Sequence, residues 1–531
     1  MKWPALLIAA SALTLAAQAP VTSAILLHPP VDAWVMPNRD YSAQNYSPLQ
    51  QINAANVTAL QPAWEYHPNA GTGPDARPAP AVKAVPLMIN GVLYIAAPNY
   101  VWAADARTGR ELWQYDWKSN GGDYIGNRGV AVLGQTLYFE TPDCNLVALN
   151  TANGAERWRR SICDLSAMYY ASAAPFIIRN HIIVGISGDA VDNPGYVAAY
   201  DPATGALQWR WYAHPAPGTP EAKSWPTTEA LLHGGGMTWG YKSYDPELNL
   251  LYFGTGNPQP VIAGNDRPGA NLYTACIIAL DPDTGKLAWY FQVSPHDTHD
   301  WDGIQTPVLI DGTIDGKPRK LLANAARNGW FFVLDRTNGK ALVSRPFVDE
   351  NWALGVDDVD AKGQPIPNPE KEPQVAGELS NPNQGGAANW FPPAFNPRTG
   401  LFYVDAENAW SIYYIYDQNK KPEGWGGNDR GGYSQASLEA IDYRTGKPRW
   451  VHPWARAVRS GLLTTAGNLV FSTGVSSDVE ALDASTGAAL WHARLGHAVS
   501  NAPMTYELDG KQYLVVAGGN ALYAFTLASQ N

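Results

Sequence analysis

Cysteine is scarce in this chain of 531 residues, and its scarcity excludes one class of redox protein at the outset. Only three cysteines occur, and none belongs to the Cys-x-x-Cys-His sequence that attaches a c-type haem. We therefore expect no covalent haem in these residues. Cys144 and Cys163 lie at corresponding ends of neighbouring predicted strands, and in an exported protein they fit either a disulfide or two buried thiols. Cys276 is expected to fill buried apolar space.

Basic residues are also few. The chain has 37 Lys and Arg against 48 Asp and Glu, a formal net charge of −11, and no run of basic residues. A surface of this sign repels nucleic acids and anionic membranes. We expect no nucleic-acid partner, and the composition favours an acidic, soluble enzyme.

Long apolar runs are absent except at the N-terminus. Lys2 precedes an apolar stretch from Ala5 to Ala17, and small residues follow as far as Ala24. This order is typical of a secretory signal peptide, and the run is shorter than the roughly 18 residues that a single anchoring helix requires. We expect residues 1–24 to be removed by cleavage after Ala24. The mature residues 25–531 should form one domain without a membrane span, in an oxidising compartment such as the bacterial periplasm.

Amphipathic helical patterns are scarce as well, which points to an all-β fold. Glycine (49 residues) and proline (42 residues) punctuate the chain, and aromatic residues make up 11% of it. Such a composition favours many short strands joined by turns.

A short unit recurs along the chain: Asp or Asn, two variable positions, Thr or Asn, Gly, three positions, and Trp. It begins at Asp105, Asn150, Asp201, Asp281, Asp442 and Asp483, ends at Trp113, Trp158, Trp209, Trp289, Trp450 and Trp491, and returns without its Trp from Asp335 to Gly339. The Asp and Gly are turn residues, and the Trp supplies a large face that packs between adjacent sheets.

Repetition at roughly 40–50 residues predicts a β-propeller with Trp-docking repeats. Independent hairpins in a sandwich would not require a Trp at a constant offset. In a closed ring the last blade is usually completed by the other terminus, so we expect Pro62–Tyr66 to join the C-terminal blade. The long connection from Pro346 to Asn389 should cover the central cavity on one face.

The most informative segment is Pro295–Gly303, which carries His296, Asp297, His299, Asp300 and Asp302. Together with Gly236–Gly240, Gly254–Pro258 and Ala326–Gly329 it resembles the active-site region of the pyrroloquinoline-quinone (PQQ) alcohol dehydrogenases. The opening of the chain, from Trp34 through Asn45–Leu49, is similar to that family too. The resemblance implies eight blades, PQQ as cofactor, and a Ca²⁺ or lanthanide ion.

The resemblance also implies roles for individual residues. Asp300 matches the active-site aspartate, which contacts the metal and accepts the alcohol proton. Asn257 and Asp302 match further metal ligands, and Asp302 corresponds to an extra acidic position in the lanthanide-using branch. The positions that match cofactor contacts are Arg128, Ser172, Thr238, Trp239, Arg327 and Asn389, with Trp239 against one face of the quinone.

Taken singly, each residue also has a structural interpretation. Asp300 and Asn257 suit turns, and Trp239 suits inter-blade packing, although it is off the repeat's offset. For His296, Asp297 and His299 we expect hydrogen-bonded loop positions.

Three positions depart from the family pattern. Lys83 stands where a cofactor-contacting glutamate is usual, although a cation can pair with a PQQ carboxylate. The adjacent cysteine pair that covers the other face of PQQ is missing around Asp123–Asn127. Ala190 replaces a metal-binding glutamate, and Asp189 or Asp192 would have to supply that carboxylate.

The sequence thus predicts an exported PQQ- and metal-dependent dehydrogenase of alcohols or related hydroxyl substrates. Its electrons would pass to a separate acceptor, such as a soluble cytochrome c. Two alternatives remain open at this point: a cofactor-free propeller that works as a binding or scaffold protein, and a propeller hydrolase or lyase that uses the acidic cluster on a bare metal.

Overall fold

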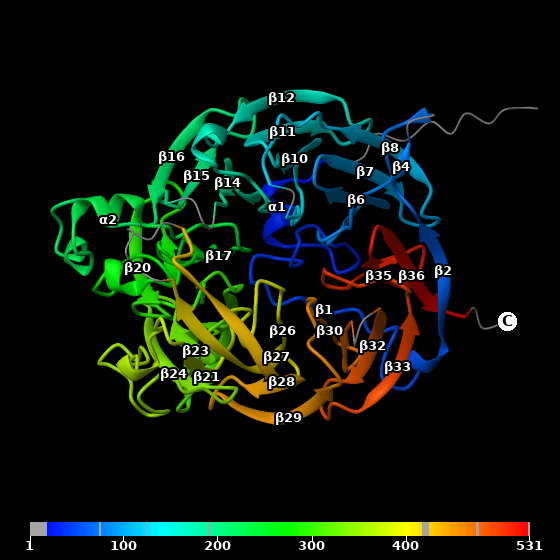
Figure 1. Cartoon of the computed structure of the whole chain (residues 1–531). Helices are drawn as coiled ribbons and strands as arrows, with labels where there is room; N and C mark the ends of the chain where they lie inside the picture. Colours follow the sequence, from blue (N-terminus) through cyan, green and yellow to red (C-terminus); the bar gives the residue numbers. More distant parts are fainter. Residues whose placement is uncertain are drawn as a thin grey trace, which may run out of the picture.

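The computed structural model describes residues 19–73, 76–123, 125–188, 192–416, 424–473 and 477–528. Eight four-stranded antiparallel sheets stand around a central axis like the blades of a propeller (Figure 1). The predicted all-β, eight-bladed propeller is therefore confirmed.

The first four blades follow one another along the chain. They comprise β5 (Leu87–Ile89), β6 (Val92–Ala97), β7 (Tyr100–Asp105) and β8 (Glu111–Asp116); β9 (Ala131–Leu133), β10 (Thr136–Thr141), β11 (Asn145–Asn150) and β12 (Glu156–Ser161); β13 (Phe176–Ile178), β14 (His181–Gly185), β15 (Tyr196–Tyr200) and β16 (Leu207–Tyr212); and β17 (Ser243–Asp245), β18 (Leu250–Gly254), β19 (Cys276–Leu280) and β20 (Leu287–Gln292).

The other four blades complete the ring. They comprise β21 (Val308–Ile314), β22 (Lys317–Ala325), β23 (Trp330–Asp335) and β24 (Lys340–Pro346); β26 (Ala394–Asn396), β27 (Leu401–Ile415), β28 (Gly427–Asp442) and β29 (Lys447–Trp454), with β25 (Glu378–Ser380) beside β27; β30 (Leu463–Thr465), β31 (Leu469–Ser472), β32 (Asp478–Asp483) and β33 (Ala489–Arg494), with β1 (Tyr46–Ser47) beside β30; and β2 (Leu60–Tyr66), β36 (Ala521–Leu527), β35 (Lys511–Gly518) and β34 (Met504–Leu508).

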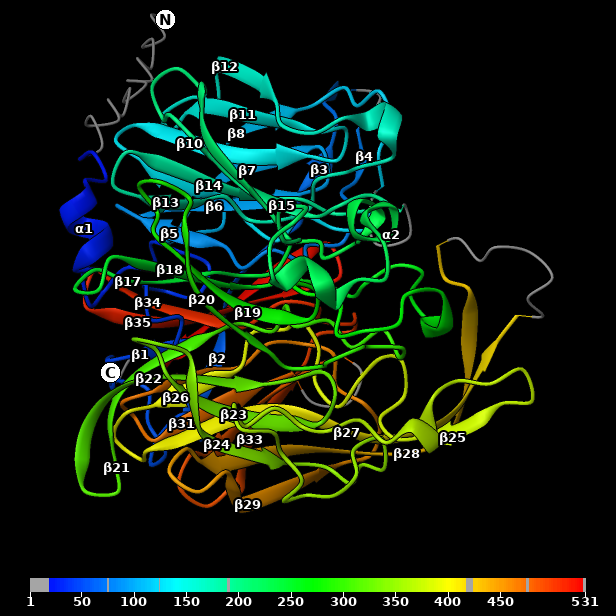
Figure 2. The same ribbon diagram turned by 90° about the vertical axis from the view of Figure 1, so that its left-hand side faces the viewer.

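Small elements lie between and outside the blades. They are a two-stranded sheet of β3 (Asn69–Ala70) and β4 (Arg77–Pro78), helices α1 (Ser23–Leu27) and α2 (Thr228–His233), and 3-10 turns at Val57–Ala59, Leu165–Ala167, Glu221–Ser224, Gly264–Asp266 and Pro369–Lys371. Helix α1 lies on one face of the ring, and the long β27–β28 hairpin extends from the opposite face (Figure 2). No helix among the described residues is long and apolar enough to cross a membrane.

The last blade is closed by the N-terminal segment, as the sequence predicts. Strand β2 pairs antiparallel with β36, so that Trp64 lies opposite Ala524. The Trp64 indole also reaches the first blade, because a Cβ built on Gly109 would lie 2.7 Å from its ring. The two ends of the chain are therefore joined both by a strand ladder and by a Trp–Gly contact.

The same contact recurs around the ring. The ring of Trp113 packs on Gly154 of the next blade, and Trp209 packs likewise on Gly285. The indole N–H of Trp113 donates to the Thr151 carbonyl at 2.9 Å, which fixes the ring against that turn. Where the repeat lacks its Trp, Val343 fills the place and packs on Gly446. The Trp of each repeat therefore docks one blade onto its neighbour, as predicted.

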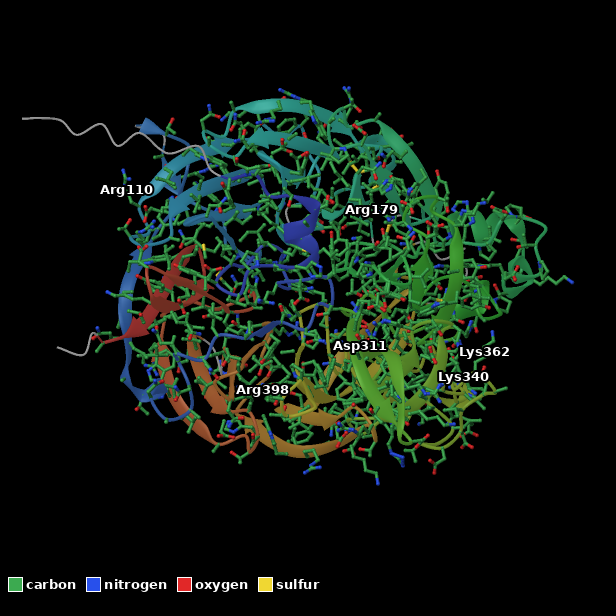
Figure 3. All side chains as sticks on the ribbon, turned by 180° about the vertical axis from the view of Figure 1, so that it is seen from behind. Arg110, Arg179, Asp311, Lys340, Lys362 and Arg398 are labelled. Atoms are coloured by element: carbon green, nitrogen blue, oxygen red, sulfur yellow. A yellow bond between two sulfur atoms is a disulfide. The ribbon has the colours of Figure 1, made fainter. Side chains whose placement is uncertain are left out.

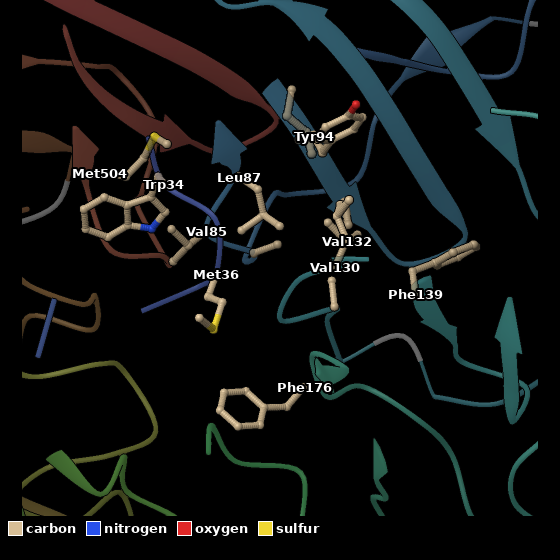
Figure 4. Close-up of a cluster of buried hydrophobic side chains, with 14 of the residues drawn as sticks. Trp34, Met36, Val85, Leu87, Tyr94, Val130, Val132, Phe139, Phe176 and Met504 are labelled. Atoms are coloured by element: carbon tan, nitrogen blue, oxygen red, sulfur yellow. The ribbon is translucent and has the colours of Figure 1, made fainter. Parts of the chain in front are cut away.

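Apolar side chains fill the space between the blades. Trp34, Leu87, Phe139 and Met504 lie in one buried cluster that joins the N-terminal segment to the first, second and last blades (Figure 4). Charged side chains such as Arg110 project from the outside of the ring (Figure 3).

The structure distinguishes the two alternatives for Cys144 and Cys163, a disulfide or two buried thiols. Cys144 and Cys163 form a disulfide, and Cys276 is buried as a free thiol, as expected. Residues 1–18 lie outside the described residues, so the signal peptide stays a prediction. The predicted cleavage site after Ala24 falls within α1, whose N-cap Thr22 accepts a hydrogen bond from the Ile25 amide.

Trp64→Ala should destabilise the ring by about 3–5 kcal/mol, because it removes a large buried side chain at the closure between the last and first blades. Denaturant unfolding measures this loss. Tyr433→Ala, which truncates an aromatic side chain that is 63% exposed, is the control and should change stability little. Equal effects of the two substitutions would contradict the proposed importance of the closure.

Candidate active site

A cavity of about 200 Å³ is enclosed by segments that belong to several blades. It is lined by Lys83, Ile125, Gly126, Arg128, Trp239, Asp300, Asp302, Arg327, Asn389, Trp390 and Trp425. These residues come from distant parts of the chain. Seven of the predicted site residues thus meet around one space: Lys83, Arg128, Trp239, Asp300, Asp302, Arg327 and Asn389.

Arg327 holds the two acidic side chains of this cavity together. Its Nη2 donates to Asp300 Oδ2 at 2.7 Å, and its Nη1 donates to Asp302 Oδ2 at 2.8 Å. All three side chains are buried. The planar guanidinium therefore neutralises two carboxylates at once, a geometry that a lysine ammonium would not reproduce.

A loop closes tightly around this arginine. The backbone carbonyl of Gln384 accepts from Arg327 Nε at 3.0 Å, and the side-chain amide of Gln384 donates to Asp300 Oδ2 at 3.2 Å. Gly386 has φ +80°, and a Cβ there would lie 2.1 Å from Arg327 Cγ. Only glycine lets the loop approach so closely, and the same loop carries Asn389 into the cavity.

The two carboxylates differ in their surroundings. Asp302 Oδ1 accepts the backbone N–H of Asn257 at 2.7 Å. Burial raises the pKa of Asp302, while Arg327 opposes that rise. Asp300 has a backbone φ of 67°, in the left-handed region that few residues other than glycine, Asn and Asp adopt. Such a conformation at a cavity wall is typical of residues whose position serves a function.

The neighbouring acidic and imidazole residues do not line the cavity. Asp297 accepts backbone N–H groups of His299 and Trp301 at 3.2 and 3.0 Å, and burial raises its pKa to about 7. The His299 ring stacks on Trp301 at 4.2 Å between centroids, and burial lowers its pKa to about 3. His296 Nδ1 donates to the Gly269 carbonyl at 2.8 Å. We interpret all three as residues that shape the loop.

Arg128 lies between two tryptophans. Its guanidinium carbon is 4.1 Å from the centre of the Trp239 ring and 4.7 Å from that of Trp390. Its Nη1 also donates to the Ser172 carbonyl at 3.1 Å and to the Ser172 hydroxyl. The face of Trp239 is therefore covered by a planar cation, so an aromatic ligand that stacks on this indole must share the space with Arg128 or displace it.

The remaining predicted residues sit just behind the cavity. Ser172 bonds both Arg128 and the Ser187 hydroxyl. The hydroxyl of Thr238 donates to the Tyr196 carbonyl, and its backbone pairs with Ile186. The side-chain amide of Asn257 donates to the Pro258 carbonyl at 3.0 Å. Each of the three positions a neighbour of the cavity rather than lining it.

The departures from the family pattern have structural consequences. Lys83 Nζ donates to the Ile125 carbonyl, and burial together with Arg128 lowers the pKa of this lysine. Gly126 lies against the lysine stem, since a Cβ there would be 2.8 Å from Lys83 Cδ. Asp189 and Ala190 lie outside the described residues, so the predicted metal ligand Asp189 stays untested.

Two tryptophans of the cavity were not predicted. Trp390 follows Asn389, and Trp425 lies just before β28, where its backbone carbonyl accepts the Ile262 N–H at 2.8 Å. Neither stands in the repeat or in one of the motifs that resemble the family. The one available signal is the position of Trp390 next to Asn389.

Comparison with known proteins agrees with this geometry. Residues 34–375 match the family model described as "Glucose/ethanol/alcohol dehydrogenase, beta-propeller domain". The chain belongs to the PQQ-dependent alcohol dehydrogenase family. Residues 434–530 also match a model described as "Outer membrane protein assembly factor BamB". As a member of this quinoprotein family the protein is a PQQ-dependent alcohol dehydrogenase-like oxidoreductase.

Individual relatives extend over most of the chain. The quinohemoprotein alcohol dehydrogenase ADH IIB of Pseudomonas putida is 37% identical over 523 residues, covering 92% of this chain and 73% of the relative. The 1-butanol dehydrogenase (cytochrome c) of Thauera butanivorans is 34% identical and covers 94% of this chain and 76% of its own. A solved europium-containing methanol dehydrogenase superposes with a TM-score of 0.86 at 29% identity, covering 95% of this chain and 99% of its own.

The cavity fits PQQ in its chemistry. A planar ligand with three carboxylates would meet three cationic side chains in this cavity: Lys83, Arg128 and the bidentate Arg327. Trp239 would offer it an aromatic face. For a hard cation the oxygen donors are Asn257, Asp300 and Asp302. Both carboxylates already bind Arg327, and the described residues contain no cluster of three or more His, Cys, Asp or Glu suited to a metal. The fit to a metal is therefore weaker than the fit to PQQ.

Asp300→Asn should fold like the parent protein, because Asn adopts the left-handed conformation as readily as Asp. Asp300→Ala should be less stable by about 1–3 kcal/mol, because alanine is strained at this φ and Arg327 loses a partner. Thermal unfolding distinguishes the two variants. Equal stability of both would contradict the inference that the backbone conformation at residue 300 is strained.

Proposed function

We propose that this protein is an exported PQQ- and metal-dependent dehydrogenase of alcohols or related hydroxyl compounds. The observation that supports it most is the cavity in which Arg327 bridges Asp300 and Asp302 beside two further cations. A buried acidic pair next to a cationic pocket provides a proton acceptor and an anion site within one space.

In this proposal PQQ occupies the cavity and, when bound, supplies the quinone that accepts the two electrons of alcohol oxidation. Lys83 and Arg128 would hold its carboxylates, with the hydroxyl of Ser172 fixing Arg128. Trp239 would bury one face of its ring system, and Asn389 and Thr238 would complete the binding surface. Ile125 and Gly126 occupy the stretch where the family's cysteine pair is missing.

Asp300 is the proposed base. Its carboxylate lines the cavity and is held by the Arg327 guanidinium at 2.7 Å, and a carboxylate in such a position is a group that accepts a proton from a hydroxyl group. Arg327 is also placed to stabilise negative charge that develops beside it.

The metal would be held by Asn257, Asp300 and Asp302, with Asp189 as a further carboxylate from outside the described residues. Ca²⁺ and lanthanide ions both prefer such oxygen ligands, and the second aspartate favours the higher charge. In the absence of the cation, Arg327 holds the same two carboxylates.

Substrate, acceptor and location are proposed from the relatives and the sequence. We propose a small alcohol as substrate and a soluble cytochrome c as electron acceptor, as the name of the Thauera relative indicates for that enzyme. The N-terminal segment would direct the chain to the periplasm.

PQQ binding to purified cofactor-free protein tests the proposal. We expect calorimetry and absorbance to show binding, and Arg128→Ala to weaken it by about tenfold or more, because a bidentate contact to a carboxylate is lost. Arg159→Ala is a matched control, since Arg159 also lies over a tryptophan, Trp117, at 5.0 Å, but neither residue lines the cavity. No PQQ binding to the parent protein, with any cation, would refute the dehydrogenase and favour a cofactor-free binding propeller.

Cation preference tests the role of Asp302. We expect Asp302→Asn to weaken lanthanide binding, measured with PQQ present, by about tenfold more than Ca²⁺ binding, because the lost charge acts more strongly on a trivalent ion. Titrations of the parent protein and of Asp302→Asn with La³⁺ and Ca²⁺ measure the difference. An unchanged ratio of the two affinities would remove Asp302 from the metal site.

A further inference from the structure

A second group of buried charges lies behind the cavity, and none of its members has a role in the proposed reaction. Glu140 is in β10 of the second blade, and Lys242 precedes β17 of the fourth. Glu140 is 1% exposed and Lys242 is 3% exposed. Fully buried charges of this kind are costly unless opposite charge and hydrogen bonds compensate them.

Lys242 is bonded to the backbone on both sides of Trp239. Its Nζ donates to the Gly240 carbonyl at 3.2 Å and reaches the Thr238 carbonyl at 3.5 Å. The ammonium fits because residue 185 is glycine: a Cβ there would lie 3.1 Å from Nζ and 2.0 Å from the Thr238 oxygen. The peptide units that carry the Trp239 indole are thus held by a single buried cation.

Glu140 is hydrogen-bonded to backbone and side-chain groups that lie next to Ser172 and Arg128. Its Oε2 accepts the Ala173 N–H at 3.2 Å, directly after Ser172, and its backbone carbonyl accepts the Asn127 side-chain amide at 3.0 Å. Asn127 precedes Arg128, and Ser172 bonds the Arg128 guanidinium. The Glu140 carboxylate therefore anchors the Ser172–Ala173 segment, while its backbone carbonyl anchors Asn127.

The two side chains also interact with each other and with Arg128 through their charges. Burial raises the pKa of Glu140 and lowers the pKa of Lys242; the positive charges of Lys242 and Arg128 oppose the first shift, and the negative charge of Glu140 opposes the second. Glu140 Oε1 has no hydrogen-bond partner among the described residues, so the attraction between these charges is its compensation on that side.

We propose that Glu140 and Lys242, two buried side chains of opposite charge, position two residues of the cofactor cavity, Arg128 and Trp239. They are positioning residues, because neither lines the cavity. Lys242 sets the backbone on both sides of Trp239, and the Glu140 carboxylate sets the segment whose Ser172 bonds the Arg128 guanidinium. The role rests on the proposed function, since the ligand so positioned is PQQ.

The test is a double-substitution cycle with PQQ affinity as its readout. We expect Glu140→Gln and Lys242→Met each to weaken PQQ binding by about tenfold, the lower end of the loss seen when a supporting partner of a binding group is removed. In the double variant Glu140→Gln/Lys242→Met, the loss of PQQ affinity should be smaller than the product of the two single losses. The reason is that neither buried charge is then left without the other. Glu140→Asp, which keeps the charge on a shorter stem, serves where Glu140→Gln does not fold.

Arg336→Met is the matched control. This substitution breaks another buried ion pair, between Arg336 and Asp245 at 2.7 Å. Asp245 is only three residues after Lys242, but neither partner lines the cavity. The substitution should lower the melting temperature and leave PQQ affinity unchanged. Single variants that lose melting temperature alone, as this control does, would overturn the positioning role, and so would strictly multiplicative losses in the cycle. Absence of PQQ binding to the parent protein would overturn the proposed function and this role together.

Discussion

Compensation of buried charge is the constraint on which the centre of this propeller depends. Asp300, Asp302 and Arg327 are removed from water together, and ions in such surroundings persist only when hydrogen bonds and opposite charge replace their hydration. The fork of Arg327 satisfies one oxygen of each carboxylate. Its remaining N–H groups bind the Gln384 carbonyl, which in turn requires glycine at residue 386. The ion pairs therefore dictate the course of the loop that delivers Asn389 to the cavity.

The ring around this centre is held by a different force. Large indoles pack on the glycines of neighbouring blades, from Trp64 on Gly109 through Trp450 on Gly487, and bury apolar area at every such joint. Because the joints lie toward the outside of the blades, the inner strands and their connecting loops are free to carry polar and charged residues. Dispersion and the hydrophobic effect thus set the frame, while electrostatics sets the site.

The fold was predictable because its signal is repeated. The Asp-x-x-Thr-Gly turn and the following Trp gave the propeller, and the closure by Pro62–Tyr66 followed from ring geometry. The site was predictable where polar residues gather in one short segment, as at Asp300 and Asp302. Trp390 was missed because a single aromatic residue carries no local pattern. Glu140 and Lys242 were missed because each stands alone in the sequence, in blades that only the closed ring brings together.

The balance of charge in the cavity bears on how a cofactor and a cation would bind together. Lys83, Arg128 and Arg327 face the two carboxylates of Asp300 and Asp302, so the cations outnumber the acids among the described lining residues. A free metal ion would add positive charge to a pocket that already has an excess, whereas a ligand with three carboxylates reverses the sign. Cation binding in this pocket should therefore depend on the anionic cofactor more strongly than in a site with a third acidic ligand. Lys83 and Ala190 stand where the family pattern has a cofactor-contacting and a metal-binding glutamate, so both departures remove a negative charge at positions where the resemblance implies cofactor or metal contacts.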